Sequence, residues 1–224
     1  MAKAKKKENL TPEERLQSAL VPDWAQPYKV PKNWCWVKLG TVCRFENGYA
    51  FKSKDFSVND GIPVVRISNI TDSSISLEEC VRTTENGIDE KYIIKNGDLL
   101  IAMSGATTGK NGIYYSDEIA YLNQRVGDIK VIDENILFSR FRNFYIANVE
   151  QEILNSAYGG AQPNISSNKI CNMNFPLPPR PEQQRIVDRI ESLFAKLDEA
   201  KEKAQSVLDS FETRKAAILH KAFT

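Results

Sequence analysis

The chain ends in the stretch PLPPRPEQQRIVDRIESLFAKLDEAKEKAQSVLDSFETRKAAILHKAFT, residues 176–224, and this stretch decides how the rest is organised. After Pro181 it contains no glycine and no further proline. Its apolar residues recur at alternating spacings of four and three, the heptad spacing of a coiled-coil helix. They form a seam that Arg214 interrupts: Ile186, Ile190, Leu193, Leu197, Ala200, Ala204, Val207, Phe211 and Ile218.

We therefore expect a continuous helix over residues 182–222. At about 1.5 Å per residue, such a helix is roughly 60 Å long. A narrow apolar stripe on a rod of that length cannot be buried by the rod itself. The sequence therefore predicts that a partner helix covers the seam.

The composition places the rest of the chain in one globular domain. With 224 residues and 42% hydrophobic residues, the chain is long enough for one well-packed domain plus the helix. The net charge of +1 does not by itself indicate a nucleic-acid partner. Four scattered cysteines and one histidine argue against a zinc site or a disulfide framework. Without a long apolar window, we expect a soluble, cytoplasmic protein that does not enter a membrane.

The order of turn and strand signals predicts an α+β fold, a mixed-strand globular domain followed by the long C-terminal coiled-coil helix. The boundaries are a basic tail with a short helix and linker over 1–31, the domain over 32–178 and the helix over 179–224. One further helix is expected over residues 135–154. The expected strands cover residues 42–47, 62–67, 98–102, 112–115, 120–122 and 127–131.

Enzyme signatures are weak in this chain. The stretch from Gly105 to Lys110 resembles a phosphate-binding loop, but its glycines are one residue too close and Asn111 replaces the hydroxyl residue that would hold magnesium. The single histidine, His220, lies on the helix rather than in the domain. We therefore expect no catalytic residue, no metal and no cofactor of its own, with a nucleotide hydrolase built on residues 104–110 as a weaker alternative.

Polar segments of the domain are typical of a binding surface instead. Residues 48–56 interleave aromatic side chains with lysines, and residues 104–112 form a glycine-rich loop able to offer N–H groups to an anion. Asn123, Gln124 and Arg125 combine two amides with a guanidinium, which can pair with adenine and guanine edges, although such amides also staple loops. The candidate binding residues are Lys52, Lys54, Arg66, Ser68, Asn69, Ser104, Thr107, Thr108, Lys110, Asn123, Gln124, Arg125, Gln162 and Asn164.

The order of several short motifs resembles the specificity subunit of type I restriction-modification systems. The motifs are WVKLG at 36–40, GYAFKS at 48–53, GIPVVRISNI at 61–70, GDLLIAMSG at 97–105, LNQR at 122–125 and PLPPRPEQQRI at 176–186. The resemblance covers the chain from about Leu10 onward, and the proline-rich entry into the long helix is its most specific element.

The resemblance implies a target recognition domain that reads one half of a bipartite double-stranded DNA sequence, joined to a spacer helix. It also implies partners: modification (methyltransferase) subunits, which use S-adenosylmethionine, and an ATP-dependent restriction subunit. By the same resemblance, full-length members normally carry two such domains and two helices paired antiparallel, whereas this sequence has one of each. We therefore expect either a natural half-subunit or the amino-terminal half of a longer chain.

A second copy of the chain would supply the missing helix, and two-fold symmetry would then imply a palindromic site with an unread spacer. From side-chain chemistry, we expect Lys52, Lys54 and Lys110 to contact phosphates. The residues expected nearest the bases are Arg66, Asn69, Asn123, Gln124 and Arg125. The alternative is a protein-binding coiled-coil adaptor without DNA specificity, which the near-neutral charge keeps open.

Overall fold

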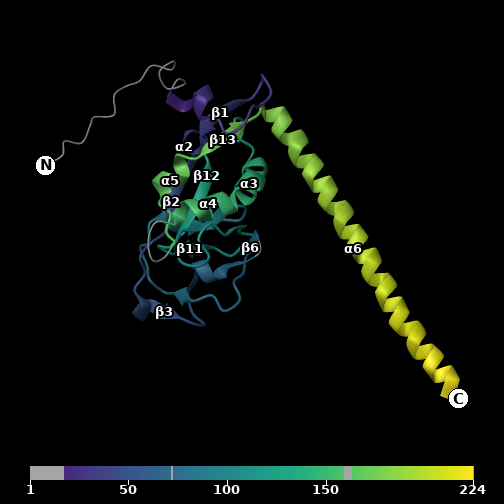
Figure 1. The fold of residues 1–224 in the computed structure, drawn as a ribbon. Coiled ribbons are helices and arrows are strands. Elements are labelled where there is room, and N and C mark those ends of the chain that lie inside the picture. Colours follow the sequence, from purple (N-terminus) through teal and green to yellow (C-terminus); the bar gives the residue numbers. More distant parts are fainter. Residues whose placement is uncertain (1–17, 72, 159–162, 224) are drawn as a thin grey trace. The chain divides into compact units, whose positions relative to one another are not determined.

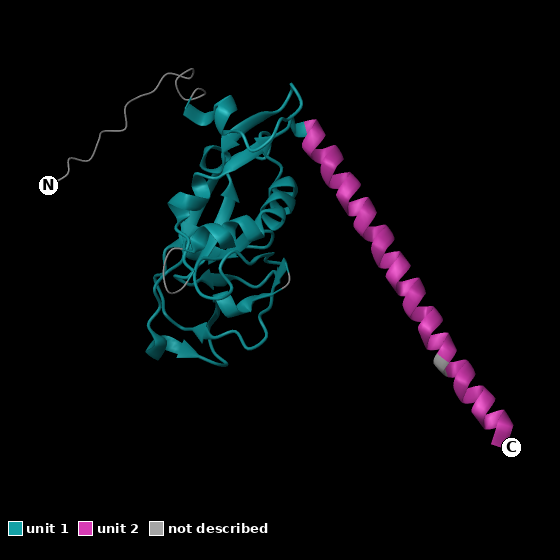
Figure 2. Cartoon of the chain, viewed as in Figure 1, with its two compact units in different colours: residues 1–180 teal, residues 181–224 magenta. Residues whose placement is uncertain are grey.

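The computed structural model describes residues 18–71, 73–158 and 163–223. The chain divides into two units, which we call the globular unit, Met1–Arg180, and the helical unit, Pro181–Thr224 (Figure 2). The fold is α+β, with mixed sheets and helices in the first unit and one long helix in the second.

A two-stranded antiparallel sheet ties the two ends of the globular unit together. It pairs β1 (Cys35–Lys38) with β13 (Asn174–Leu177). Trp36 is buried on β1 and its ring N–H donates to the Tyr28 carbonyl at 3.1 Å. Near this sheet in the sequence are η1 (Asp23–Ala25) and the short helix α2 (Leu39–Val42). The helix α5 (Ser167–Cys171) packs against β2 (Cys43–Asn47) (Figure 1).

The larger sheet has six strands in the order β2-β12-β9-β10-β6-β5. Within it, β10 and β6 are parallel, and the other neighbours are antiparallel. All four residues of β9 are buried, as expected for a central apolar strand. The bounds are β2 (Cys43–Asn47), β12 (Val126–Val131), β9 (Leu99–Ala102), β10 (Asn111–Ile113), β6 (Ser73–Ile75) and β5 (Ile70–Thr71).

The second sheet has five short strands in the order β3-β7-β4-β11-β8. Its bounds are β3 (Phe56–Ser57), β7 (Arg82–Thr83), β4 (Ile62–Val65), β11 (Ala120–Leu122) and β8 (Ile93–Ile94). Short 3-10 turns precede β3, β5 and β8, namely η2 (Ser53–Asp55), η3 (Ile67–Asn69) and η4 (Glu90–Tyr92).

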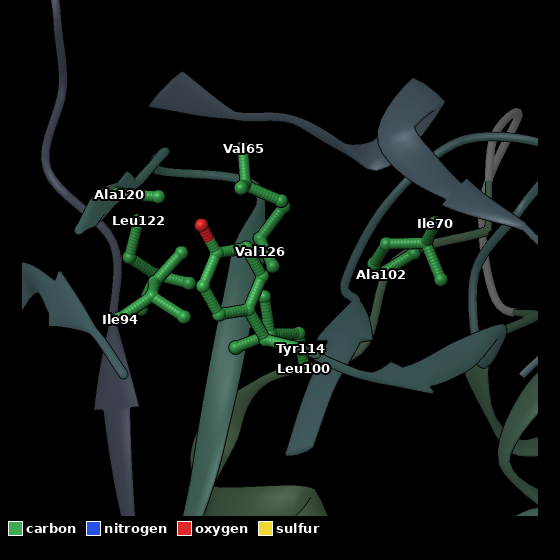
Figure 3. Close-up of a cluster of buried hydrophobic side chains, with 9 residues drawn as sticks. All are labelled: Val65, Ile70, Ile94, Leu100, Ala102, Tyr114, Ala120, Leu122 and Val126. Carbon is green, nitrogen blue, oxygen red and sulfur yellow. The ribbon is translucent and has the colours of Figure 1, made fainter. Parts of the chain in front are cut away.

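Both sheets contribute to one buried cluster. Val65 and Leu122 come from the smaller sheet, and Leu100 and Val126 come from the larger one, with Tyr114 among them (Figure 3). The Tyr114 hydroxyl donates to the Glu118 carbonyl at 2.7 Å, so this ring is buried without leaving its polar atom unsatisfied. The shared core fixes the loops that connect the two sheets.

Most expected strands are present with shifted ends. The prediction for residues 120–122 is confirmed by β11, whereas the strand expected to reach residue 67 ends at Val65, where the chain turns into η3. The single helix expected over 135–154 is wrong. The structure has α3 (Ser139–Asn148) and α4 (Glu150–Ala157), separated by Val149, whose φ of −96° and ψ of 10° lie outside α-helical geometry.

The helix α6 (Arg180–Phe223) has 44 residues and begins at the last residue of the globular unit, so it supplies the described part of the helical unit. From Leu193 onward every described seam residue is exposed, including Leu197 at 65% and Phe211 at 60%. Exposed Phe194 and Leu208 lie beside the seam and widen the apolar stripe. Across the described residues, no helix has the length and apolar character needed to span a membrane.

Candidate functional site

Three segments that are far apart in the sequence line one hollow of the globular unit. They come from the end of β9, from the connection between β11 and β12, and from the chain before α5. The hollow has a volume of about 440 Å³ and is lined by Met103, Ser104, Gln124, Arg125, Pro163 and Asn164. Four of the predicted binding residues therefore lie together. Gln162, also predicted, lies outside the described residues.

Backbone hydrogen bonds hold the three segments in place. The Met103 N–H donates to the Arg125 carbonyl at 2.9 Å, and the Ile165 N–H donates to the Met103 carbonyl at 2.9 Å. Ser104 and Asn164 form an antiparallel β-bridge. The end of β9 thus lies between the other two segments, as a central strand would, and sets their spacing.

A tight turn over residues 123–126 carries Gln124 and Arg125. The Val126 N–H closes the turn by donating to the Asn123 carbonyl at 2.8 Å, and the Gln124 N–H donates to the Tyr49 carbonyl at 2.9 Å. Tyr49 and Asn123 also form a parallel β-bridge. Both turn side chains are exposed, so the turn presents them to solvent from a fixed backbone.

The turn depends on Gly48. A Cβ atom at Gly48 would lie 2.0 Å from the carbonyl oxygen of Asn123, far inside van der Waals contact. Any larger residue would therefore push the segment around Tyr49 away from the turn. This explains why the GYAFKS motif begins with glycine.

The glycine-rich loop does not form the anion cradle that the sequence predicts. Four of its N–H groups donate to carbonyls of the protein itself, those of Gly105, Thr108, Gly109 and Lys110. The Thr108 hydroxyl is buried and donates to the Gly105 carbonyl at 2.7 Å. The Asn111 side chain donates to the Glu150 carboxylate at 3.0 Å. The loop is thus braced internally, and its geometry does not support the nucleotide-hydrolase alternative.

Asn69 also has a structural role that its side-chain chemistry did not reveal. It is buried, and its side-chain oxygen accepts the Arg66 N–H at 2.9 Å, which caps η3. Its neighbour Ser68 is exposed. Because the side chains of Asn69 and Thr108 are buried and bonded within the protein, these two predicted binding residues are not available to a ligand in this structure.

Other buried polar atoms near the hollow have no hydrogen-bond partner among the described residues. They are the hydroxyl oxygens of Ser104 and Thr107 and the Nε atom of Arg66. Arg66 is the chain neighbour of Ile67, whose Cδ1 atom lies 3.6 Å from the position that a Gly105 Cβ would take. Buried polar atoms without hydrogen-bond partners are rare in native structures, because leaving them unpaired costs free energy.

Lys52 and Lys54 lie in a second hollow, with Asp55, Phe56, Ser57, Thr84 and Glu85. The two carboxylates partly balance the lysines. The Tyr49 hydroxyl donates to Glu85 at 3.2 Å, and the negative charge of Glu85 raises the pKa of Tyr49. Tyr49 thus contacts both the 123–126 turn and the second hollow. Lys110, the third predicted phosphate ligand, is exposed on the glycine-rich loop and lines neither hollow.

Sequence reasoning missed Met103 and Pro163 in the first hollow and Ser57, Thr84 and Glu85 in the second. Met103 and Pro163 offer no side-chain hydrogen bonds, so only their adjacency to Ser104 and Asn164 could have indicated them. Thr84 and Glu85 belong to none of the motifs described above. No signal in the sequence singles them out.

One buried carboxyl lies away from both hollows. Asp128 on β12 is buried, and burial, reinforced by the negative charge of Asp98, raises its pKa to about 7. The Lys130 ammonium lies 3.1 Å from Asp128 and 3.3 Å from Asp98. Within the ranges that the structure describes, no three histidine, cysteine, aspartate or glutamate residues are grouped to hold a metal ion.

Comparison with known proteins gives consistent matches. The family model of the type I restriction modification DNA specificity domain matches residues 31–208. The specificity subunit of the type I restriction enzyme EcoAI from Escherichia coli is 27% identical over 185 residues, which are 78% of this chain and 30% of that protein. The EcoBI specificity subunit, also from Escherichia coli, is 28% identical over 194 residues, 86% of this chain and 39% of that protein.

The fold is similar to that of a solved structure. The crystal structure of the HsdS subunit from Thermoanaerobacter tengcongensis matches with a TM-score of 0.60 at 21% identity, over 83% of this chain and 43% of that chain. The chain spans less than half the length of the curated relatives it matches.

Proposed function

From the premise that this chain belongs to the family of type I restriction modification DNA specificity domains, we propose that it recognises one half of a bipartite DNA target. In this proposal, residues 32–178 are the target recognition domain and residues 179–224 are the spacer helix. The chain performs no reaction itself. It directs a methyltransferase and an ATP-dependent restriction subunit to their DNA site, in the cytoplasm.

The observation that carries this proposal is the chemistry of the first hollow. Its lining offers a guanidinium and two amides, from Arg125, Gln124 and Asn164, which are exposed, and contains no carboxylate. These are the groups that hydrogen-bond to base edges and phosphate oxygens. The Ser104 hydroxyl is buried beside these groups and has no hydrogen-bond partner among the described residues.

The other predicted residues are proposed to make different kinds of contact with DNA. Lys52, Lys54 and Lys110 are exposed and are proposed to contact phosphates, which position the duplex without specifying its sequence. Asn123, Gln124 and Arg125 are proposed to lie near the bases, with Arg66 beside them. We leave Asn69 and Thr108 out of the contact set because their side chains are bonded within the protein.

The helical unit is proposed to pair antiparallel with a second such helix, from another copy or from the second half of a longer chain. Ala200 and Ala204 lie near the middle of α6, where small side chains allow two helices to approach closely. Phe194 and Leu208 make the exposed stripe broader than a two-helix seam requires. We propose that modification subunits dock on this additional apolar surface of the same helix.

Mapping of methylated positions in cells with and without this chain tests the function. We expect a gapped sequence motif whose methylation disappears when the chain is deleted. If methylation is unchanged and the purified chain with its partners shows no salt-dependent DNA binding, the protein-binding adaptor is the correct alternative.

A further inference from the structure

The turn over residues 123–126 combines a fixed backbone with free side chains. Its N–H and carbonyl groups are bonded to Val65, Tyr49 and Met103, which belong to other segments of the globular unit. No hydrogen bond or ion pair within the described residues engages the side chains of Gln124 and Arg125, and both are exposed. Binding a ligand through them therefore requires ordering of side chains only, which lowers the entropic cost of recognition.

The hollow at this turn differs from the second hollow in the charged residues that line it. Arg125 shares its hollow with neutral groups alone, whereas Lys52 and Lys54 share theirs with Asp55 and Glu85. A guanidinium without a neighbouring carboxylate keeps its donors free for an acceptor pair on a ligand. The first hollow is thus suited to directional hydrogen bonding, and the second to weaker, charge-based contact.

The hydrogen-bonding geometry of the two side chains indicates which base edges they can contact. Arginine makes two parallel hydrogen bonds to O6 and N7 of guanine, and glutamine makes two to N6 and N7 of adenine, both on the major-groove edge. Gln124 and Arg125 are consecutive in the turn and line the same hollow, so one stretch of the groove can be contacted by both. Ser104 and Asn164, paired across the β-bridge, line the hollow beside them.

We infer that the 123–126 turn is the specificity-determining element of the half-site, with Arg125 reading a guanine and Gln124 an adjacent adenine in the major groove. This inference rests on the proposed function and deepens it, because it assigns two base pairs of the target to two side chains. Lys52 and Lys54 contribute affinity that does not depend on sequence.

The test uses the complex of the full chain with its modification subunits and a library of duplexes randomised within the half-site. Three variants are compared with wild type: Arg125→Ala, Gln124→Glu and, as the control for a general loss of affinity, Lys54→Ala. Arg125→Lys is a further control that keeps the charge but loses the paired donors. Thermal unfolding of each variant verifies that the globular unit is intact.

Arg125→Ala and Arg125→Lys are expected to lose the preference for guanine at one position by about 10- to 100-fold, while the other positions keep theirs. Gln124→Glu is expected to change the preference at the neighbouring position from adenine to cytosine, because a carboxylate accepts from the cytosine amino group. Lys54→Ala is expected to weaken binding to all sequences alike.

The inference is overturned if the Arg125 and Gln124 variants select the same half-site as wild type. In that case the wild-type complex still shows a sequence preference, so the proposed function stands and another element reads the bases. If the wild-type complex selects no sequence at all, the proposed function itself fails, and the inference fails with it.

Discussion

Leu100 and Leu197 are the same side chain in opposite settings. Leu100, on β9 in the globular unit, has none of its surface exposed, whereas Leu197, on α6, is 65% exposed. Around Leu100 both sheets supply apolar neighbours, and the connecting loops bond to one another. Along α6 beyond Leu193, the apolar side chains of the described residues are exposed.

The difference shows that the two units place their apolar side chains differently with respect to solvent. The globular unit buries its apolar core within itself, and its loops carry the side chains that we propose bind DNA. The helical unit has regular secondary structure, but its apolar side chains beyond Leu193 are exposed, and we propose that a partner helix covers them. Substitutions can therefore separate folding from assembly.

The largest expected effect concerns assembly. Leu197→Asp combined with Phe211→Asp places two charges on the seam, and we expect self-association of the chain to be abolished, because a charge buried between helices is not tolerated. Sedimentation velocity over a range of concentrations measures it. Ser192→Asp with Ser206→Asp is the matched control, with the same charges at the same separation on exposed positions off the seam.

The control is expected to associate like wild type. Association of the seam variant equal to that of the control would contradict pairing through the seam. A wild-type chain that stays single at every concentration would show that the partner helix does not come from a second copy.

The second largest expected effect concerns the stability of the globular unit. Leu100→Ala is expected to lower the free energy of unfolding of the globular unit by about 2–5 kcal/mol, because it leaves a cavity in the core. Leu197→Ala is expected to change it by only a few tenths of a kcal/mol. All three tryptophans precede residue 40, so their fluorescence during urea unfolding reports on the globular unit alone. Equal losses in the two variants would mean that α6 is part of the same cooperative core.

Gly48→Ala tests the close approach that positions the turn. The added Cβ would meet the Asn123 carbonyl, so we expect a destabilisation of about 1–3 kcal/mol together with weakened sequence selection. Gly87→Ala is the control. A Cβ there would meet nothing within 4 Å, although its positive φ of 78° adds backbone strain. A Gly48→Ala variant with wild-type stability and selection would show that the Tyr49 segment does not hold the turn.

The smallest effect is on pH dependence. The pKa of Asp128 is raised from 3.8 to about 7 in the folded chain, so the folded state holds a proton that the unfolded state releases between these values. Stability from this group is present at low pH and is lost as the pH rises through about 7. Asp128→Asn is thus expected to raise the melting temperature relative to wild type more at pH 8 than at pH 5. The same difference at both pH values would contradict a buried, proton-holding carboxyl.

The sequence predicted the long helix closely, because its heptad spacing needs no tertiary information. The expected range of 182–222 lies within the observed Arg180–Phe223. The buried strands were found for a similar reason, since apolar runs such as β9 are bounded by turn residues. The helix interruption at Val149 was not found. The glycine-rich loop packs there, with the position of a Gly109 Cβ lying 3.1 Å from the Glu150 carbonyl, and that contact depends on the fold.

For the candidate site, the sequence predicted the types of residue but not how they are arranged in space. Residue types indicated Arg125 and Asn164, but their meeting depends on the bridge from Ser104 to Asn164, which joins positions 60 residues apart. Asn69 and Thr108 show the converse: a polar side chain in a suitable motif gives no sign of whether it faces solvent or caps its own backbone. Tertiary hydrogen bonds decide that, and local sequence does not record them.

Insertion of one heptad, seven residues, into the middle of α6 tests the division between a reading unit and a spacing unit most directly. The insertion preserves the seam and lengthens each helix by about 10 Å, roughly three base pairs of B-form DNA. Base-resolution mapping of methylation directed by this variant should show the same half-site sequence with a gap longer by about three base pairs. An unchanged gap, or a changed half-site sequence, would contradict the account.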